Sequence, residues 1–317
     1  MQPLISLKSL VKNYRDHRAL DGVDLDVMPG ITGLLGPNGA GKSSLIKAIL
    51  GLVKITSGTG TVLSHRLTAD GKKIRNDIGY MPEDDCYIPG MSGIEVVHFA
   101  ASLSGLPKVE GMRRSHEILD FCDMKQERYR AIETYSTGMR QKVKFAAAIV
   151  HDPKFLILDE PTSGLDPEER EALLKRISVL CADGGKSALL STHILPDVQS
   201  VCDQVVILSN GQVRLDKPLA ELNAIQIPTV EISVDQTKED FVKRLHEKSL
   251  DVTQLENGNI EVTGESLETL TNELWRAADA TSTMILSLKP AMNSLEGIFM
   301  ETVAEASKTS REAANAG

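Results

Sequence analysis

The stretch Gly36-Pro37-Asn38-Gly39-Ala40-Gly41-Lys42-Ser43 decides the fold of this chain. An apolar run, Ile31–Leu35, comes directly before it, and the amphipathic pattern of a helix, Ser44–Leu50, comes directly after it, with Gly51 placed to end the helix. A strand, a glycine-rich loop ending in Gly-Lys-Ser and a helix, in this order, form the context of a phosphate-binding loop. A glycine-rich turn with a chance lysine would not explain all three elements.

The glycines of this loop allow backbone N–H groups to point at one phosphate chain, and the helix N-terminus adds a partial positive charge. We expect Lys42 to reach the outer phosphates of a nucleotide and the Ser43 hydroxyl to hold Mg²⁺. The predicted phosphate-binding residues are Gly36, Pro37, Asn38, Gly39, Ala40, Gly41, Lys42, Ser43 and Ser44.

The composition indicates a globular protein of a reducing compartment, the cytoplasm. The chain has 317 residues, enough for one large or two modest domains, and 41% of them are hydrophobic, which supports a proper core. No apolar run reaches the roughly 18 residues that a membrane-spanning helix needs, and no N-terminal segment has the pattern of a signal peptide. Neither a zinc site nor a disulfide framework is expected, because the four cysteines are far apart: Cys86, Cys122, Cys181 and Cys202.

The net charge of −9 is unevenly distributed along the chain. Residues 221–317 hold 17 acidic and 8 basic residues and carry this whole excess, whereas residues 1–220 hold 27 of each sign. A neutral body with an acidic C-terminal segment argues against nucleic-acid binding, which needs a basic face. Aromatic residues make up only 4% of the chain and offer little for base stacking on a single strand.

A second motif places two carboxylates at the end of a buried strand. The apolar run Phe155–Leu158, typical of a central parallel strand, is followed by Asp159 and Glu160. Ligands of such sheets bind at the carboxyl ends of the strands. We expect Asp159 to hold Mg²⁺, directly or through water, and Glu160 to act as the general base on an attacking water. Two solvated acids would be the alternative if no phosphate loop were present.

Two aromatic side chains have two interpretations each. Tyr14 lies in a polar stretch between strands predicted over residues 4–12 and 22–28, and is either an exposed loop residue or a ring that stacks on adenine. His193 follows the strand predicted over Ser187–Leu190 and is either structural or directed at the same site as Glu160.

Two further segments have the pattern of a helix start. Ser136 and Gly138, in Tyr135-Ser136-Thr137-Gly138-Met139-Arg140-Gln141, precede a helix pattern that runs to Val150; they form either an ordinary N-cap or a second anion site. Asp166 as N-cap and Pro167 at the first helical position predict a helix to about Cys181. Later in the chain, Asn210-Gly211 predicts the turn of a β-hairpin.

Residues 90–130 show helix signals and no strand signal, which predicts a helical insertion in an otherwise α/β domain. A short strand, Ile78–Met81, comes before them; Ser92 and Glu95 form a capping box, and a second helix is expected over Met112–Cys122. The loop ahead of Ser92 holds apolar residues that either fold under the helical block or form an interface for a partner: Tyr87, Ile88, Pro89 and Met91.

A new pattern begins after the linker Ile227-Pro228. The expected order of elements is strand, helix, strand, strand, helix, strand (βαββαβ), the ferredoxin-like arrangement, with no catalytic constellation in it. We therefore expect an ATPase-type α/β domain over residues 1–223, with a helical subdomain over about 84–150. A small α+β accessory or regulatory domain follows over 224–306, ending in a helix over about 294–304. A disordered tail is expected over 307–317.

Together the motifs resemble those of the nucleotide-binding subunit of an ABC transporter, over about residues 4–220. Gly36–Ser43 resembles the Walker A loop, and Leu156–Pro167 resembles Walker B followed by the D-loop, which contains Asp166. Ser191-Thr192-His193 resembles the switch-histidine loop, and Tyr14 falls where the family has its adenine-stacking aromatic residue. Residues 135–141 resemble the signature, with Ser136 and Gly138 matching it and Thr137 and Met139 departing from the family's Gly and Gln.

The resemblance implies a P-loop ATPase fold, the substrate ATP and the cofactor Mg²⁺. Glu83 takes the place of the Q-loop glutamine, so a carboxylate would contact Mg²⁺ there and add charge near the γ-phosphate. The C-terminal part is similar to the extra domain of ABC-2-type export ATPases, including Ser-Leu-Glu-x-Ile-Phe at Ser294–Phe299.

The resemblance also implies partners and a location. The signature residues Ser136, Thr137, Gly138 and Met139 would complete the ATP site of a second copy, and closure of that dimer would drive a separate membrane permease from the cytoplasmic face of the membrane. The alternatives are an ABC ATPase of DNA repair or translation, which resembles tandem domains or carries long coiled coils, and a P-loop kinase, in which the signature and the histidine loop would have no purpose.

Overall fold

The structure is a computed structural model that describes residues 2–15, 17–222, 229–235, 239–248, 250–255, 258–264, 266–290, 295, 297–300, 302–304 and 306. The chain forms two compact units, Met1–Leu219 with Phe299–Gly317 and Ala220–Ile298. The first unit thus ends at Leu219, four residues before the predicted boundary after residue 223. Residues from Phe299 onward group with the first unit, although the accessory domain was predicted to extend to residue 306. The predicted tail and the linker Ile227-Pro228 lie outside the described residues.

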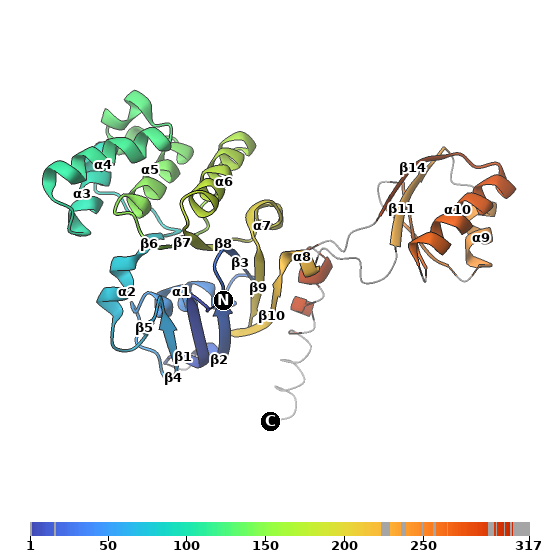
Figure 1. Cartoon of the computed structure of the whole chain (residues 1–317), viewed down its shortest axis with the longest axis horizontal. Coiled ribbons are helices and arrows are strands. Elements are labelled where there is room, and N and C mark those ends of the chain that lie inside the picture. The colour runs from blue at the N-terminus through green and yellow to red at the C-terminus, as the bar shows by residue number, and fades with distance from the viewer. Residues whose placement is uncertain are drawn as a thin grey trace. The chain divides into compact units, whose positions relative to one another are not determined.

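The central sheet of the first unit has six strands. In spatial order they are β10 (Gln212–Pro218), β9 (Gln204–Ser209), β3 (Ile31–Leu35), β8 (Ser187–Ser191), β7 (Phe155–Asp159) and β6 (Ile78–Met81), labelled in Figure 1. The four strand pairs from β9 to β6 are parallel, and only the edge strand β10 is antiparallel to its neighbour. Every residue of β3, β7 and β8 is buried, as the apolar runs predict for central parallel strands.

A second sheet of the same unit is antiparallel and has four strands. The strands predicted over residues 4–12 and 22–28 are longer than expected, because the chain turns sharply at Arg15 (φ 49°) and leaves only a tight hairpin between them. Tyr14 is therefore the last residue of a strand and not a loop residue. In spatial order the strands are β2 (His17–Val27), β1 (Ile5–Tyr14), β4 (Ser57–Val62) and β5 (His65–Arg66).

Helix α1 (Lys42–Ile49) contributes to the main hydrophobic core together with strands of both sheets. Its side chains Leu45, Ile46 and Ile49 are fully buried there, and each such burial contributes about 1.5–3 kcal/mol. The apolar face of α1 thus fixes the helix that directly follows the phosphate loop. A short helix, α2 (Gly71–Asp77), precedes β6.

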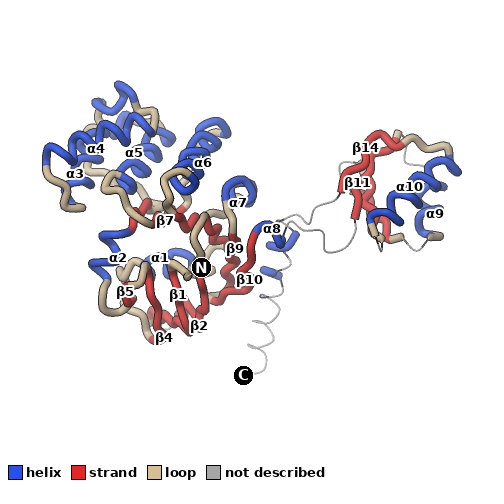
Figure 2. The backbone as a smooth tube through the Cα atoms, in the orientation of Figure 1, coloured by secondary structure: helices blue, strands red, loops and turns tan. Residues whose placement is uncertain are grey.

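The segment between β6 and β7 is a block of helices, as expected (Figure 2). Glu95 accepts hydrogen bonds from the backbone and side chain of Ser92 at 2.7 Å, which forms the predicted capping box. The second helix starts earlier than expected, at Lys108. The block consists of α3 (Gly93–Leu103), α4 (Lys108–Phe121), α5 (Thr137–Ile149) and the 3₁₀ turns η1 (Lys125–Tyr129) and η2 (Ile132–Thr134).

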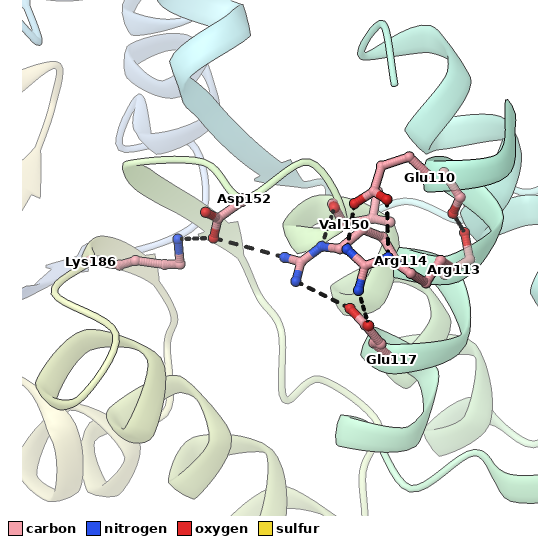
Figure 3. A network of polar contacts seen from close by, with 9 residues as sticks. Glu110, Arg113, Arg114, Glu117, Val150, Asp152 and Lys186 are labelled. Atoms are coloured by element: carbon pink, nitrogen blue, oxygen red, sulfur yellow. Dashed lines mark hydrogen bonds and ion pairs between the residues drawn. The ribbon is translucent and has the colours of Figure 1, made fainter. Parts of the chain in front are cut away.

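A chain of polar contacts joins α4 to the base of the central sheet (Figure 3). Arg114 contacts the Val150 carbonyl at 3.4 Å and Asp152 at 3.9 Å, and Asp152 pairs with Lys186 at 2.6 Å, just before β8. Because the Asp152 side chain is 71% exposed, each of these ion pairs is worth about 0–1 kcal/mol, and the network contributes little to the stability of the fold.

Helix α6 (Pro167–Ala182) begins as predicted, with Asp166 accepting a hydrogen bond from the backbone of Glu169 at 2.8 Å. A buried carboxylate on the next helix, α7 (Leu195–Val201), accepts hydrogen bonds from the Thr162 hydroxyl and the Arg170 guanidinium. This carboxylate, that of Asp197, ties the segment after β7 to the segment after β8. A last short helix is α8 (Leu219–Leu222).

The second unit is an antiparallel sheet with the strand order β12-β13-β11-β14 and two helices, and its own hydrophobic core. Its elements follow along the chain as β11 (Thr229–Val234), α9 (Glu239–His246), β12 (Asp251–Gln254), β13 (Ile260–Thr263), α10 (Leu267–Thr281) and β14 (Ile285–Pro290). The described residues between 295 and 306 are helical, and the Asn210 side chain donates a hydrogen bond to the Ala306 carbonyl at 3.4 Å, within the first unit. None of the described helices combines the length and the apolar character that crossing a bilayer requires.

Candidate functional site

The phosphate loop has a backbone that only glycine can adopt at key positions. Gly39 and Gly41 have φ of 79° and 108°, and Gly41 is the N-cap of α1. A Cβ atom on Gly41 would lie 2.5 Å from the carbonyl oxygen of Ala19, and one on Gly36 would lie 2.3 Å from that of Leu208. The loop is thus packed directly against β2 and β9.

The hairpin turn between β9 and β10 is hydrogen-bonded to the phosphate loop. Asn210 and Gly211 both have positive φ, as the predicted Asn-Gly turn requires. The Gly211 N–H donates to the Ala40 carbonyl at 2.9 Å, and its own carbonyl accepts from the Asp21 N–H at 2.8 Å. The turn therefore joins the phosphate loop to β2.

Most of the predicted site residues line one cavity of about 460 Å³. Its lining comes from three regions. These are the hairpin end of β1 and β2, the phosphate loop with the start of α1, and the acidic residues after β6 and at the end of β7. The lining residues are Tyr14, His17, Ala19, Pro37, Asn38, Gly39, Ala40, Gly41, Lys42, Ser43, Ser44, Glu83, Asp159 and Glu160.

His17 is the functional candidate that the sequence analysis missed. It is the first residue of β2 and the cross-strand partner of Tyr14, so the two rings lie at the same end of the hairpin and both line the cavity. A histidine in a polar stretch has no local signal of its own. It could have been identified only from its spacing, because two residues separate it from Tyr14 and a tight turn between them would pair the two residues across the hairpin.

Lys42 lies between the loop and the acidic residues. Its ammonium group donates to the carbonyls of Gly36 and Pro37. Burial lowers the pKa of Lys42, and the nearby carboxylates of Glu160, Asp159 and Glu83 oppose this shift. The side chain thus supplies a desolvated cation at the place where the phosphate loop would hold a phosphate chain.

Asp159 and Glu160 are both buried, with 5% and 7% of their surface exposed. Burial raises the pKa of each carboxyl group. Glu160 also has a left-handed backbone (φ 48°), and its N–H donates to the Ser191 carbonyl at 2.9 Å. A non-glycine residue held in this conformation costs about 1–3 kcal/mol, which marks Glu160 as a candidate functional residue.

His193 contacts Glu160 directly. Its Nδ1 atom lies 2.8 Å from Oε2 of Glu160, while 63% of the imidazole side chain is exposed. Of the two interpretations open from the sequence, this geometry favours a histidine at the site over a structural one, because an exposed ring contributes little to packing.

The oxygen donors at the cavity fit Mg²⁺, which prefers hydroxyl, carboxylate and phosphate oxygens. The Ser43 hydroxyl and the carboxylates of Asp159 and Glu83 come from α1, β7 and the loop after β6, and all three residues line the cavity. Glu83 is exposed at its rim, and its backbone carbonyl accepts a hydrogen bond from Lys144 at 2.7 Å.

The signature segment lies elsewhere in the first unit. Ser136 caps α5 and accepts a hydrogen bond from the Met139 N–H at 3.2 Å. At Gly138 a Cβ atom would lie 1.9 Å from the Glu169 carboxylate at the start of α6, so these two helix starts are in close contact. None of the candidate residues of this region lines the nucleotide cavity of the same chain: Ser136, Thr137, Gly138, Met139 and Asp166.

One turn along α5 from Ser136, Arg140 contacts the loop after β6. Its guanidinium lies 3.4 Å from the Asp85 carboxylate and 5.4 Å from the centre of the Tyr87 ring. This contact joins the start of α5 to the segment that leads away from Glu83.

The same loop borders an apolar groove of about 240 Å³, at which Ile88 and Phe99 are 43% and 41% exposed. Pro89 does not line it. In the loop itself Ile88 and Pro89 are exposed, while Tyr87 and Met91 are partly buried, so the structure favours the interface interpretation over complete burial under the helical block. The apolar part of the lining comes from the loop, α3, η2 and α5: Pro82, Tyr87, Ile88, Met91, Val96, Phe99, Ala100, Leu103, Ile132, Val143 and Ala147.

Comparisons with known proteins agree with this architecture. The ABC transporter family model matches residues 20–163. The uncharacterized ABC transporter ATP-binding protein YxlF of Bacillus subtilis is 38% identical over 76% of this chain and 80% of its own length. The Nod factor export ATP-binding protein I of Cupriavidus metallidurans is 32% identical over 67% of this chain and 70% of its own.

Among solved structures, cbiO1 from Clostridium perfringens, described as part of the ABC transporter complex cbiONQ, superposes with a TM-score of 0.63. It is 28% identical in sequence, and the match covers 70% of this chain and 90% of that one. The chain belongs to the ATP-binding proteins of ABC transporters. It is an ATPase with ATP as its substrate, and this membership decides against a P-loop kinase.

The raised pKa of Glu160 has a consequence for stability. The pKa of this carboxyl group in the folded protein lies above the ordinary glutamate value of 4.5. The carboxyl group therefore stabilises the fold most at pH below 4.5, and this contribution is lost as the pH rises through the raised pKa. We expect Glu160→Gln to unfold at higher denaturant concentration than the wild type at pH 7, and the gain to shrink toward pH 4. Urea unfolding of the variant and the wild type at pH 7 and pH 4 measures this difference. If Glu160→Gln is instead less stable than the wild type, and more so at pH 7, the favourable contact between Glu160 and His193 outweighs the cost of burying the carboxylate.

Proposed function

We propose that this chain is the ATP-hydrolysing subunit of an export transporter, dimerises on ATP and drives a separate membrane permease. The observation that carries the catalytic part is Glu160, which lines the same cavity as Lys42 and is contacted at 2.8 Å by His193 from outside that lining. Export is proposed by analogy with the relative named for Nod factor export. The proposed location is the cytoplasmic face of the membrane, where the permease would hold the subunit peripherally.

In the proposed reaction, Glu160 takes a proton from a water molecule as the water oxygen bonds to the γ-phosphorus, and the bond from that phosphorus to the bridging oxygen breaks. The products are ADP and phosphate. The contact with His193 orients the Glu160 carboxylate, and the phosphate loop and Lys42 hold the phosphates. Mg²⁺, held by Ser43, Asp159 and Glu83, would neutralise charge on the phosphate oxygens. The Tyr14 ring stacks on the adenine.

The proposed dimer follows from the position of the signature segment. Ser136 caps a helix whose N-terminus is suited to an anion, and the segment does not line the cavity of its own chain. A second copy, related by a twofold axis, would place Ser136, Thr137, Gly138 and Met139 against the cavity of the first, with Asp166 nearby. Each ATP would then be bound by both subunits.

We also propose that the second unit is a ferredoxin-like accessory domain without a catalytic role. The order of its elements and the strand order β12-β13-β11-β14 support this assignment. Residues 220–298 hold 14 acidic and 6 basic residues, which sets this unit apart from the nearly neutral first unit. Its role is proposed to be regulation or assembly of the transporter.

The test of the catalytic assignment is Glu160→Gln. The amide cannot accept the proton, so turnover should fall roughly 10²–10⁴-fold while ATP binding remains. Phosphate release and ATP titration measure the two properties, and Glu171→Gln on α6 is the matched control. Lys42→Ala should weaken ATP binding itself. Near-normal turnover in Glu160→Gln would exclude Glu160 as the base.

Complementation between two inactive variants tests the shared site. A chain with Ser136→Arg keeps its own phosphate loop, and one with Lys42→Ala keeps its own signature, so a mixed dimer has one intact site. Equal mixtures should recover up to about one quarter of the wild-type rate, because random pairing makes half of the dimers mixed. Each variant alone is the control. Mixtures that stay inactive at every ratio argue against composite sites.

The apolar groove beside Tyr87 is the proposed docking site for a cytoplasmic helix of the permease. Tyr87→Asp together with Met91→Asp should leave basal ATPase activity unchanged, because neither residue lines the nucleotide cavity, and should abolish co-purification of the permease from solubilised membranes. Pro89→Asp, in the same loop but outside the groove, is the matched control. Unchanged co-purification contradicts the assignment, and so does unfolding of the double variant.

A further inference from the structure

The ring of Tyr14 has a cation over one of its faces. The Lys12 ammonium lies 4.4 Å from the centre of the ring, within the roughly 6 Å over which a cation is attracted to an aromatic face. The two residues are two positions apart in β1, so their side chains leave the same face of the strand. The arrangement therefore follows from the strand geometry of this hairpin.

The ammonium group is itself held in place. It donates a hydrogen bond to the carbonyl of Lys54 at 2.8 Å. The backbone around it is fastened to the same segment, because Asn13 donates to the Thr56 hydroxyl at 2.9 Å and Thr56 donates to the Val11 carbonyl at 2.8 Å. Lys54 and Thr56 lie in the stretch between α1 and β4, so the Lys12 ammonium and the β1 backbone beside it are fastened to the same piece of chain.

The Lys12 ammonium covers one face of the ring, and Tyr14 lines the nucleotide cavity with 39% of its surface exposed, whereas Lys12 does not line it. The face opposite the ammonium is therefore the one that we expect a base to meet. A lysine that bound phosphate would have to be among the lining residues, as Lys42 is.

From these contacts we propose that Lys12 is a positioning residue for nucleotide binding. It covers the rear face of Tyr14 and fixes the ring, so that the base of ATP stacks on the front face. The inference rests on the proposed stacking role of Tyr14 and adds to it the group that orients the ring. An unsupported tyrosine at the end of a hairpin would lose rotational freedom each time a base binds, whereas the cation and its carbonyl anchor restrict the ring beforehand.

The test compares a ligand that has a base with one that has none. Lys12→Met keeps the aliphatic stem and removes the charge, so the affinity for ATP should fall about two- to five-fold. The affinity for inorganic tripolyphosphate should stay unchanged, because that ligand contacts the phosphate loop alone. Lys12→Arg should restore ATP affinity, since a guanidinium also binds an aromatic face. Isothermal titration calorimetry of the full chain measures all three.

Tyr14→Ala separates this inference from the assignment on which it rests. If Tyr14→Ala leaves ATP affinity unchanged, both the stacking role and the role of Lys12 are wrong. If Tyr14→Ala weakens ATP binding but Lys12→Met does not, only the inference about Lys12 is overturned. An equal loss of ATP and tripolyphosphate affinity in Lys12→Met would also overturn it, because the lysine would then support the fold of β1. In the Tyr14→Ala background, Lys12→Met should cause no further loss of ATP affinity.

Discussion

The close backbone contact between the phosphate loop and its neighbours is the constraint on which the site depends. Gly36 and Gly41 lie so near the carbonyls of Leu208 and Ala19 that no side chain fits. The loop can take this position only because β3 leads into it and α1, with its buried face, leads out of it. Because α1 is fixed in the core, the positions of Lys42 and Ser43 in its first turn are fixed as well. Strand β7 ends at Asp159, which lies at the same edge of the parallel sheet.

The chemistry of the site works against the stability of the fold. Two buried carboxyl groups with raised pKa lie near one half-buried lysine, Lys42, and one of them, Glu160, also has a strained backbone. A stability optimum would place apolar residues at such positions, as along the rest of β7. Retaining charged groups there is the pattern expected where activity needs a desolvated, preorganised site.

How far the sequence predicts this structure depends on how local each signal is. The phosphate loop, the acidic end of β7, the capping box at Ser92 and the Asn-Gly turn are encoded by adjacent residues, and the structure contains all four. Strand β4 was not predicted, because Ser57-Gly58-Thr59-Gly60 has little strand propensity and takes its form from pairing with β1. His17 and the contacts of Asp197 were missed for a related reason: their partners are brought near by a tight turn or by tertiary packing.

Arg140, one turn from the N-terminus of α5, joins this helix to Asp85 and Tyr87 in the loop after β6. Lys144, one turn further along α5, donates a hydrogen bond to the Glu83 carbonyl at 2.7 Å, so the helix holds the same loop at two points. A displacement of this loop would therefore act first on the end of α5 that Ser136 caps.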